Sequence, residues 1–283
     1  MYPAPFEYFT PSTTKEALLL LKQHGDNAKL LAGGHSLIPM MKLRLLSPSV
    51  IIDLGHVRDL TGIREDQDCL IIGAMTTHAA LGVSPVVRKR APLLAEVVPW
   101  IGDAQVRNRG TIGGSIAHAD PAADWPAALL ALDAEIVVAG DSSVRTIASK
   151  DFFVDLLTTD LRAGEIVTEL RVPVVSGGHA YEKVRQPASG FALVGIAAQV
   201  LVEGHICRDV RIGLTGVSHK PARATATEAA LKGRPLDDRR VMEACQHVTD
   251  GLDMLDDMHA SAEFRVELAR VHARRAITRA ARM

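Results

Sequence analysis

Two pairs of adjacent glycines are the features of this sequence with the clearest chemical meaning. The first pair, Gly33 and Gly34, follows the apolar run 28–32 and is followed at once by His35 and Ser36. Glycine places no Cβ in front of its backbone N–H, so an anionic oxygen can approach closely, and the start of the next helix adds unpaired N–H donors. The pattern predicts a phosphate-binding loop. A purely structural interpretation is also open, in which glycine supplies a positive φ and Ser36 caps the helix.

The second pair, Gly113 and Gly114, lies in the segment Thr111–Ser115, where two hydroxyl side chains flank it. Arg107 and Arg109 bring positive charge close by. The glycines are paired, with no Gly-Lys-Ser/Thr after them, so the segment is neither a P-loop nor a dinucleotide-binding fingerprint of the G-x-G-x-x-G type. Two such turns predict a ligand with two phosphates, held from both sides between two subdomains.

Two carboxylates follow the second glycine pair. Asp120 and Asp124 could accept hydrogen bonds from the hydroxyl groups of a ribose or ribityl chain. Alternatively, Asp124 caps a helix that begins at Trp125–Pro126, where proline is favoured in the first turn. Both interpretations stay open at this point.

Bulk composition excludes several classes of function. The chain has 283 residues, 47% of them hydrophobic, and a net charge of −1, which is typical of a globular protein and gives no basic surface for nucleic acid. Three scattered cysteines form no C-x-x-C motif, so we expect no zinc or iron–sulfur ligation, no disulfide framework and a reducing compartment. The start of the sequence lacks the pattern of a signal peptide and no apolar run could span a bilayer, so we expect a cytoplasmic protein. The arginine-rich stretch 265–282 predicts a solvated or subunit-facing helix.

The first 174 residues alternate between helical and strand patterns. A capping box of Thr13 and Glu16 begins a helix that ends at Gly25, and a β-α-β unit follows over 28–54. Further strands are predicted at 70–74, 135–139, 144–147 and 166–172, and further helices at 76–81, 91–100 and 126–132.

The character of the chain changes after residue 174. Residues 174–179 combine glycine and serine after Pro173, which marks a boundary. Strands are then predicted at 180–184, 192–202 and 210–214, followed by helices at 225–232, 239–248 and 260–279. The fold class is therefore α+β, with domains 1–174 and 175–283 and the first divided at about residue 56.

Three blocks of sequence resemble one protein family. AGGHSLIPMMKLR, QVRNRGTIGGSIAHADPAADWPAALLALDAEI and EKVRQPASGFALVGIAA resemble the FAD-binding medium subunit of molybdenum hydroxylases, of the carbon monoxide dehydrogenase and xanthine dehydrogenase type. The resemblance covers nearly the whole chain. It implies a two-subdomain FAD-binding region of the vanillyl-alcohol-oxidase/PCMH type, followed by a C-terminal domain of antiparallel sheet plus helices.

The resemblance also implies which residues bind FAD. Asp124 would accept from a hydroxyl of the cofactor, Leu161 would be the apolar neighbour of the flavin ring, and Lys183 would lie near the isoalloxazine, where a cation stabilises a reduced flavin. Without the resemblance, Lys183 reads as a strand-end lysine facing solvent. His35 is expected to take part without a covalent bond to FAD. The residues expected at the diphosphate are Ala32, Gly33, Gly34, His35, Ser36, Thr111, Gly113, Gly114 and Ser115.

The implied function is electron transfer within a larger enzyme. The family pattern is a small subunit with [2Fe-2S] clusters and a large molybdenum-cofactor subunit, expected as a dimer of heterotrimers, with FAD here passing electrons to an external acceptor. This flavoprotein subunit would hold no metal and no catalytic side chain. One alternative is a stand-alone FAD-dependent oxidoreductase, for which Tyr181 and His118 are the available acid–base groups. Another is a non-catalytic module that binds a nucleotide or phosphosugar.

Overall fold

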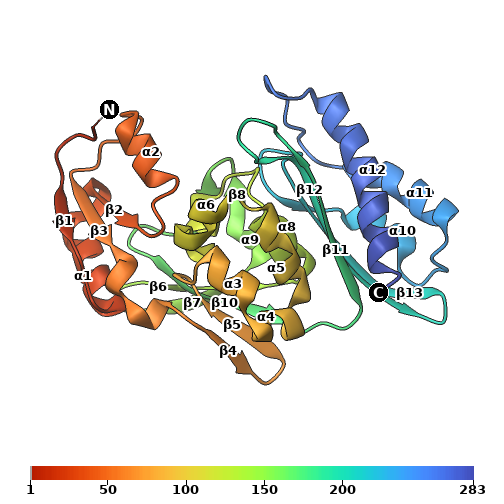
Figure 1. The fold of residues 1–283 in the computed structure, drawn as a ribbon, viewed down its shortest axis with the longest axis horizontal. Coiled ribbons are helices and arrows are strands. Elements are labelled where there is room, and N and C mark those ends of the chain that lie inside the picture. Colours follow the sequence, from red (N-terminus) through yellow and green to blue (C-terminus); the bar gives the residue numbers. More distant parts are fainter. Residues whose placement is uncertain (1) are drawn as a thin grey trace.

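A computed structural model describes residues 2–283 as three regions that follow one another along the chain (Figure 1). The first is built on a three-stranded parallel sheet in the order β1-β3-β2, with β1 at Glu7–Phe9, β2 at Ala28–Leu31 and β3 at Val50–Asp53. Helices α1 (Thr14–His24) and α2 (Leu37–Lys42) complete this region. The predicted β-α-β unit is confirmed, whereas β1 was not predicted.

Helix α1 begins and ends where the sequence indicates, but its capping differs in one detail. The Thr13 hydroxyl accepts from the Glu16 N–H at 3.2 Å, and Gly25 ends the helix with φ +52°. The Glu16 carboxylate accepts instead from the backbone and hydroxyl of Ser12, at 2.8 and 2.9 Å. The predicted reciprocal capping box is therefore wrong in its second half, because a serine one position earlier offers two donors.

The second region is a five-stranded antiparallel sheet in the order β4-β5-β10-β6-β7. Its strands are β4 (Ile63–Asp66), β5 (Cys69–Gly73), β6 (Glu135–Ala139), β7 (Val144–Ala148) and β10 (Ile166–Pro173). A short hairpin of β8 (Phe153–Asp155) and β9 (Thr158–Thr159) comes between β7 and β10 in the sequence. The helices of this region are α3 (His78–Val83), α4 (Pro85–Arg90), α5 (Pro92–Val97), α6 (Ala104–Arg109), α7 (Ile112–His118), α8 (Trp125–Ala131) and α9 (Ser149–Phe152).

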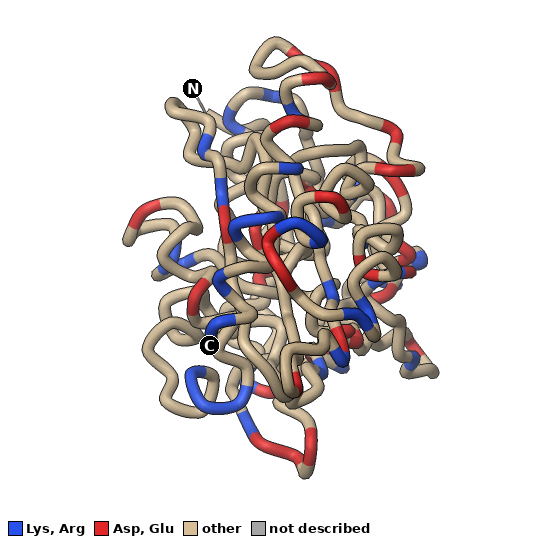
Figure 2. Tube along the Cα trace, turned by 90° about the vertical axis from the view of Figure 1, so that its right-hand side faces the viewer, with Lys and Arg blue, Asp and Glu red and all other residues tan. Residues whose placement is uncertain are grey.

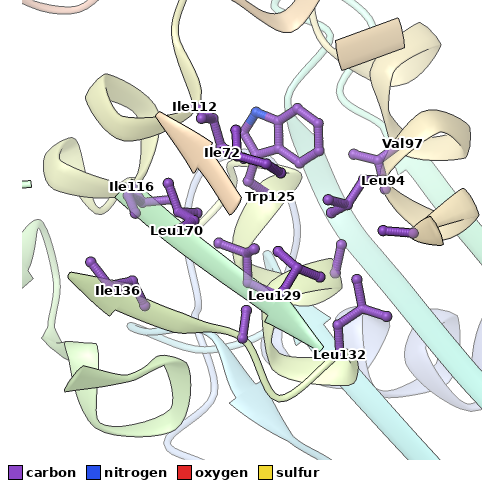
Figure 3. Close-up of a cluster of buried hydrophobic side chains, with 14 of the residues drawn as sticks. Ile72, Leu94, Val97, Ile112, Ile116, Trp125, Leu129, Leu132, Ile136 and Leu170 are labelled. Atoms are coloured by element: carbon purple, nitrogen blue, oxygen red, sulfur yellow. The ribbon is translucent and has the colours of Figure 1, made fainter. Parts of the chain in front are cut away.

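Helix α8 forms the centre of the molecule. All seven of its residues are buried, which is the pattern of a helix covered on every side. Trp125 and Leu129 pack with Ile112 and Leu170 in the core of the second region (Figure 3). On the other side α8 packs on the third sheet, where a Cβ on Gly213 would lie 1.9 Å from the Ala127 carbonyl oxygen. Glycine is required there because helix and strand backbones meet directly.

The third region is a four-stranded antiparallel sheet in the order β11-β12-β13-β14, whose outer face is covered by helices. Helix α12 packs on β11 and β12, opposite α8 (Figure 1). The predicted strands and helices are confirmed, each with small shifts at its ends. The elements are β11 (Gly178–Arg185), β12 (Ala192–Glu203), β13 (Ile206–Thr215), β14 (Ala222–Arg223), α10 (Thr225–Leu231), α11 (Asp238–Ala244) and α12 (Ala262–Ala280).

The prediction of a solvated or subunit-facing arginine helix is wrong at its first arginine. Arg265 on α12 is 2% exposed and donates to both carboxylate oxygens of Asp257 at 2.8 Å. Its other terminal nitrogen donates to the carbonyls of Leu193 and Gly216, both at 2.7 Å. The guanidinium therefore anchors α12 to the sheet. The sequence could not show this, because the acceptors come from β12 and a turn.

Charge is dispersed rather than concentrated. In the view of Figure 2, basic and acidic residues are interspersed along the trace. Within residues 2–283 no helix combines the length and the apolar character that crossing a membrane would require.

Candidate functional site

The first glycine loop leaves a row of backbone donors free. It follows β2, and Gly34 has φ +78°, a conformation that side chains other than glycine rarely adopt. Within the described part of the chain, the N–H groups of residues 33–36 donate to no acceptor. The Ser36 side chain makes no capping hydrogen bond to α2, so the structural interpretation of Ser36 as a side-chain cap is wrong. Unpaired N–H groups and a free hydroxyl together form a site for an anion.

His35 is exposed at this loop. Its Nδ1 lies 3.0 Å from the Gly33 carbonyl oxygen, which can only accept, so Nδ1 carries a proton. This contact holds the ring against the loop and leaves Nε2 directed away from that carbonyl. The structure thus gives His35 a role in shaping the loop.

The second glycine pair does not form a turn, and this prediction is wrong. Gly113 and Gly114 lie in the first turn of α7, whose N-cap is Thr111. The four N–H groups of residues 112–115 donate to the Thr76 carbonyl, the Ala74 carbonyl, and the hydroxyl and carbonyl of Thr111, at 3.1, 2.8, 3.2 and 3.0 Å. This segment therefore offers an anion no free backbone donors at those four positions.

The glycines of the two segments pack against each other instead. A Cβ on Gly33 would lie 2.4 Å from the Arg109 carbonyl oxygen and 2.6 Å from the Gly110 Cα. A Cβ on Gly114 would lie 3.2 Å from the Cβ of Ala32 and 2.8 Å from the Thr111 hydroxyl. These are distances that Cβ atoms do not tolerate without displacement. The glycines therefore join the first two regions and set the free donors of one loop beside the helix start of the other.

A buried polar cluster links the second region to the third. The carboxylate of Asp124, at the start of α8, accepts from the Tyr181 hydroxyl at 2.5 Å. Lys183 Nζ lies 2.8 and 2.9 Å from the two oxygens of Asp124 and donates to the Trp100 carbonyl at 3.0 Å. Tyr181 and Lys183 come from the same face of β11. We call these three side chains the Asp124 cluster.

The Asp124 cluster bears on two expectations. Asp124 occupies the N-cap position of α8, as the sequence predicts, but its side chain makes no capping hydrogen bond. The Lys183 side chain is 1% exposed, so the interpretation of it as a solvent-facing lysine is wrong. Burial raises the pKa of Asp124 and lowers that of Lys183, and the attraction between them opposes both shifts. The family resemblance predicts a role for Asp124 and for Lys183 separately, but the sequence could not predict that the two side chains contact each other.

Tyr181 is excluded as a substrate-facing base. It is fully buried, and burial together with the Asp124 carboxylate raises its pKa well above the usual value. Sequence reasoning considered Tyr181 only as an acid–base group and missed that it is the second donor to Asp124. The alternation of β11, which places residues 181 and 183 on one face, is the signal that could have found it.

His78 is a further polar side chain that sequence reasoning missed. It begins α3, is 4% exposed, and its Nδ1 accepts from the Trp125 indole N–H at 3.0 Å. Its main chain bonds to Gly110, next to the second glycine segment. A lone histidine in an apolar pattern gives no signal, and only the fold brings it to the glycine segments.

Leu161 follows β9, which packs on α7, and the side chain is half-buried against the core of the second region. It thus lies on the side of the molecule that carries the second glycine segment. Within residues 2–283 no group of three or more histidine, cysteine or acidic residues could hold a metal ion.

Comparison with known proteins identifies the family to which the chain is similar. Residues 4–175 match the model of the FAD binding domain in molybdopterin dehydrogenase, and residues 179–280 match that of the CO dehydrogenase flavoprotein C-terminal domain. The carbon monoxide dehydrogenase medium chain of Hydrogenophaga pseudoflava is 39% identical over 99% of this chain and 98% of its own length. The glyceraldehyde dehydrogenase medium chain of Sulfolobus acidocaldarius is 38% identical over 96% of both chains.

A solved structure agrees with the sequence comparison. The carbon monoxide dehydrogenase of Hydrogenophaga pseudoflava that lacks the Mo-pyranopterin moiety of its cofactor superimposes with a TM-score of 0.96 and 41% identity, covering 99% of this chain and 98% of that one. The chain therefore belongs to the family of FAD-binding medium chains of molybdopterin dehydrogenases, flavoprotein subunits whose cofactor is FAD.

Proposed function

We propose that this chain is the electron-transfer subunit of a heterotrimeric molybdenum hydroxylase, taking electrons from the [2Fe-2S] clusters of a partner and passing them to an external acceptor. The observation that carries the proposal is the row of four free N–H groups at residues 33–36, inside the domain that matches the FAD-binding family. FAD supplies the chemistry of collecting electrons and releasing them as a pair. The residues present fit its diphosphate, because the loop offers four free backbone donors and the free hydroxyl of Ser36.

The two glycine segments would contribute to FAD binding in different ways. Ala32, Gly33, Gly34, His35 and Ser36 would hold the diphosphate directly, through free backbone donors and the Ser36 hydroxyl. Residues Thr111, Gly113, Gly114 and Ser115 would act mainly by close packing and through side-chain hydroxyls, since their N–H groups are engaged, as is that of Ile112.

The Asp124 cluster and Leu161 complete the proposed site. Asp124 has four lone-pair positions, so it could accept from a cofactor hydroxyl while retaining Tyr181 and Lys183. Lys183 would place a cation on the flavin side of the second region, and Leu161 would supply an apolar wall. The close relation to FAD-binding medium chains supports these assignments.

The proposed assembly contains a small iron–sulfur subunit and a large molybdenum-cofactor subunit, arranged as a dimer of heterotrimers in the cytoplasm. The relatives are named as medium chains of dehydrogenases with different substrates, carbon monoxide and glyceraldehyde, so the substrate is set by a partner. We also propose the division into domains 1–174, with subdomains 1–56 and 57–174, and 175–283, supported by family matches that end at residue 175 and begin at residue 179.

The alternative of a stand-alone oxidoreductase is less well supported. Such an enzyme needs an acid or base that reaches a substrate, and Tyr181 is fully buried with its hydroxyl on Asp124. His118, at the end of α7, is the remaining candidate from the sequence.

Direct electron exchange tests the proposed function without knowledge of the substrate. The small iron–sulfur chain is reduced, freed of reductant and mixed anaerobically with the FAD-loaded chain. We expect the visible flavin absorbance to fall as the cluster absorbance of the oxidised form returns. Failure of the chain to retain FAD would refute the proposal, and so would an FAD that exchanges no electrons with the reduced partner. Reduction of the isolated chain by an organic substrate would favour the stand-alone enzyme.

A further inference from the structure

The hydrogen bond from Trp125 fixes the protonation of His78. The indole nitrogen of Trp125 can only donate, so His78 Nδ1 must be its acceptor, at 3.0 Å. A neutral imidazole whose Nδ1 accepts carries its proton on Nε2. The two rings are tilted by 46° with their centroids 5.7 Å apart, so the contact is made at the ring edges. His78 therefore presents an N–H donor on the side away from Trp125.

The surroundings of His78 keep the ring neutral. Burial is the main cause that lowers the pKa of His78, and together with the electrostatic influence of His35 and Arg107 it brings this pKa to about 4. At neutral pH the ring is thus a single donor with a single acceptor, and the acceptor is already used.

The donor end of His78 has no partner among residues 2–283. The ring lies against Gly110, where a Cβ would come within 2.7 Å of Nε2 and 2.8 Å of Cδ2. On its other side, the Cα of Gly110 packs against Gly33, the first glycine of the loop with free donors. His78 as a whole is 4% exposed, but Nε2 is not one of the fully enclosed polar atoms without a partner, so this donor stays open to a group from outside the chain. An acceptor is expected at the junction of the two glycine segments.

We propose that His78 is a cofactor-binding residue, which donates its Nε2–H to an oxygen of the FAD diphosphate where the two glycine segments meet. This inference rests on the proposed function. It assigns to α3 a contact that neither glycine motif contains. A neutral donor fits this position because the free backbone N–H groups of residues 33–36 in the adjacent loop are also neutral donors, and the same anion could accept from both.

A substitution that separates the two ends of the ring tests the proposal. In His78→Asn the amide oxygen takes the place of Nδ1 and still accepts from Trp125, whereas the donor at Nε2 is lost. We expect the full chain to bind FAD and ADP roughly 10–100-fold more weakly, the range for one hydrogen bond to a charged group, with riboflavin binding unchanged. The matched control is Trp125→Phe, which keeps the histidine and removes the donor to its Nδ1. Equal affinity of His78→Asn and the parent chain for both diphosphates would overturn the proposal.

A measurement on the unsubstituted chain covers the case in which the variant does not fold. Nitrogen-15 spectra of the histidine-labelled full chain should show His78 as the neutral Nε2–H form from pH 6 to 8. Addition of ADP should move its Nε2 resonance and leave Nδ1 nearly unchanged. An unmoved Nε2 with ADP bound would contradict the contact with the diphosphate and leave the proposed function intact. A parent chain that binds neither FAD nor ADP would refute the proposed function itself.

Discussion

Replacing Lys183 with methionine should expose the energetic cost of the Asp124 cluster. Methionine is similar in length and fits an apolar site, but it leaves a carboxylate that is 6% exposed with Tyr181 as its remaining side-chain donor. Three contacts of Nζ, at 2.8, 2.9 and 3.0 Å, are lost together. Breaking a buried pair in this way typically costs about 3–5 kcal/mol. We expect a loss of that size in the free energy of unfolding, measured by urea denaturation at pH 7.5.

The pH dependence of Lys183→Met gives an independent check on the cause. Burial already raises the pKa of Asp124, and removal of Lys183 takes away the largest opposing influence. The pKa of Asp124 in the folded variant then lies above its value in the unfolded chain, so protonation favours folding. The difference in stability between variant and parent should therefore shrink as the pH falls from 8 toward 5. It should be constant if the loss were one of packing alone.

A second substitution isolates the charge. Asp124→Asn in the Lys183→Met background removes the unpaired charge and keeps an acceptor for Tyr181, so the double variant should be more stable than Lys183→Met alone. The coupling energy should be at least about 1 kcal/mol, within the range for residues in contact. A loss below about 1 kcal/mol in Lys183→Met, or exact additivity in the double variant, would refute the reasoning.

Two further substitutions, each with a control variant, and one chemical probe test other parts of the structure. Gly33→Ala should lower the free energy of unfolding by about 1–3 kcal/mol and weaken FAD binding, because the new Cβ would lie 2.4 Å from the Arg109 carbonyl oxygen. The control is Gly140→Ala, whose Cβ would make only ordinary contacts, from 3.5 Å. Thermal unfolding compares the two variants. Arg265→Met should cost about 1.5–3 kcal/mol in urea denaturation, since it removes the donor to two carbonyls and to Asp257, whose carboxylate keeps two backbone donors. Arg239→Met on an exposed pair should cost under about 1 kcal/mol. Burial raises the pKa of Cys207 to about 11 and that of Cys245 to about 12. At pH 8 a thiol reagent should therefore modify the half-buried Cys69 first, and mass spectrometry can identify the modified residue. Rapid labelling of Cys245 in the native chain would contradict its burial.

The elements that sequence patterns predicted well are those with strong local signals. Helix α1 has a threonine cap and a terminal glycine, and the strands of the third region have long apolar runs. The elements missed are short or half-exposed, such as β1, β4 and the hairpin of β8 and β9. Their residues pair because neighbouring strands offer partners, which is information that no local window holds.

The candidate site divides in the same way. The free donors of the first glycine loop follow from residue type and order, so the sequence was sufficient to locate them. The second glycine pair was misread as a turn because the requirement for glycine there is the approach of Ala74 and Ala32, both distant in sequence. The partners of Asp124, Arg265 and His78 likewise come from other elements, and tertiary packing alone brings them together.

The complete enclosure of α8 has a consequence for how the chain can be divided. One side of this helix packs into the core of the second region, and the other is covered by β12 and β13. A fragment ending near residue 175 would expose the apolar side of α8 that β12 and β13 cover, and it would leave Asp124 without Lys183. The chain therefore cannot be cut at the boundary between the two family domains without exposing buried residues. We expect the second and third regions to unfold as a single cooperative unit.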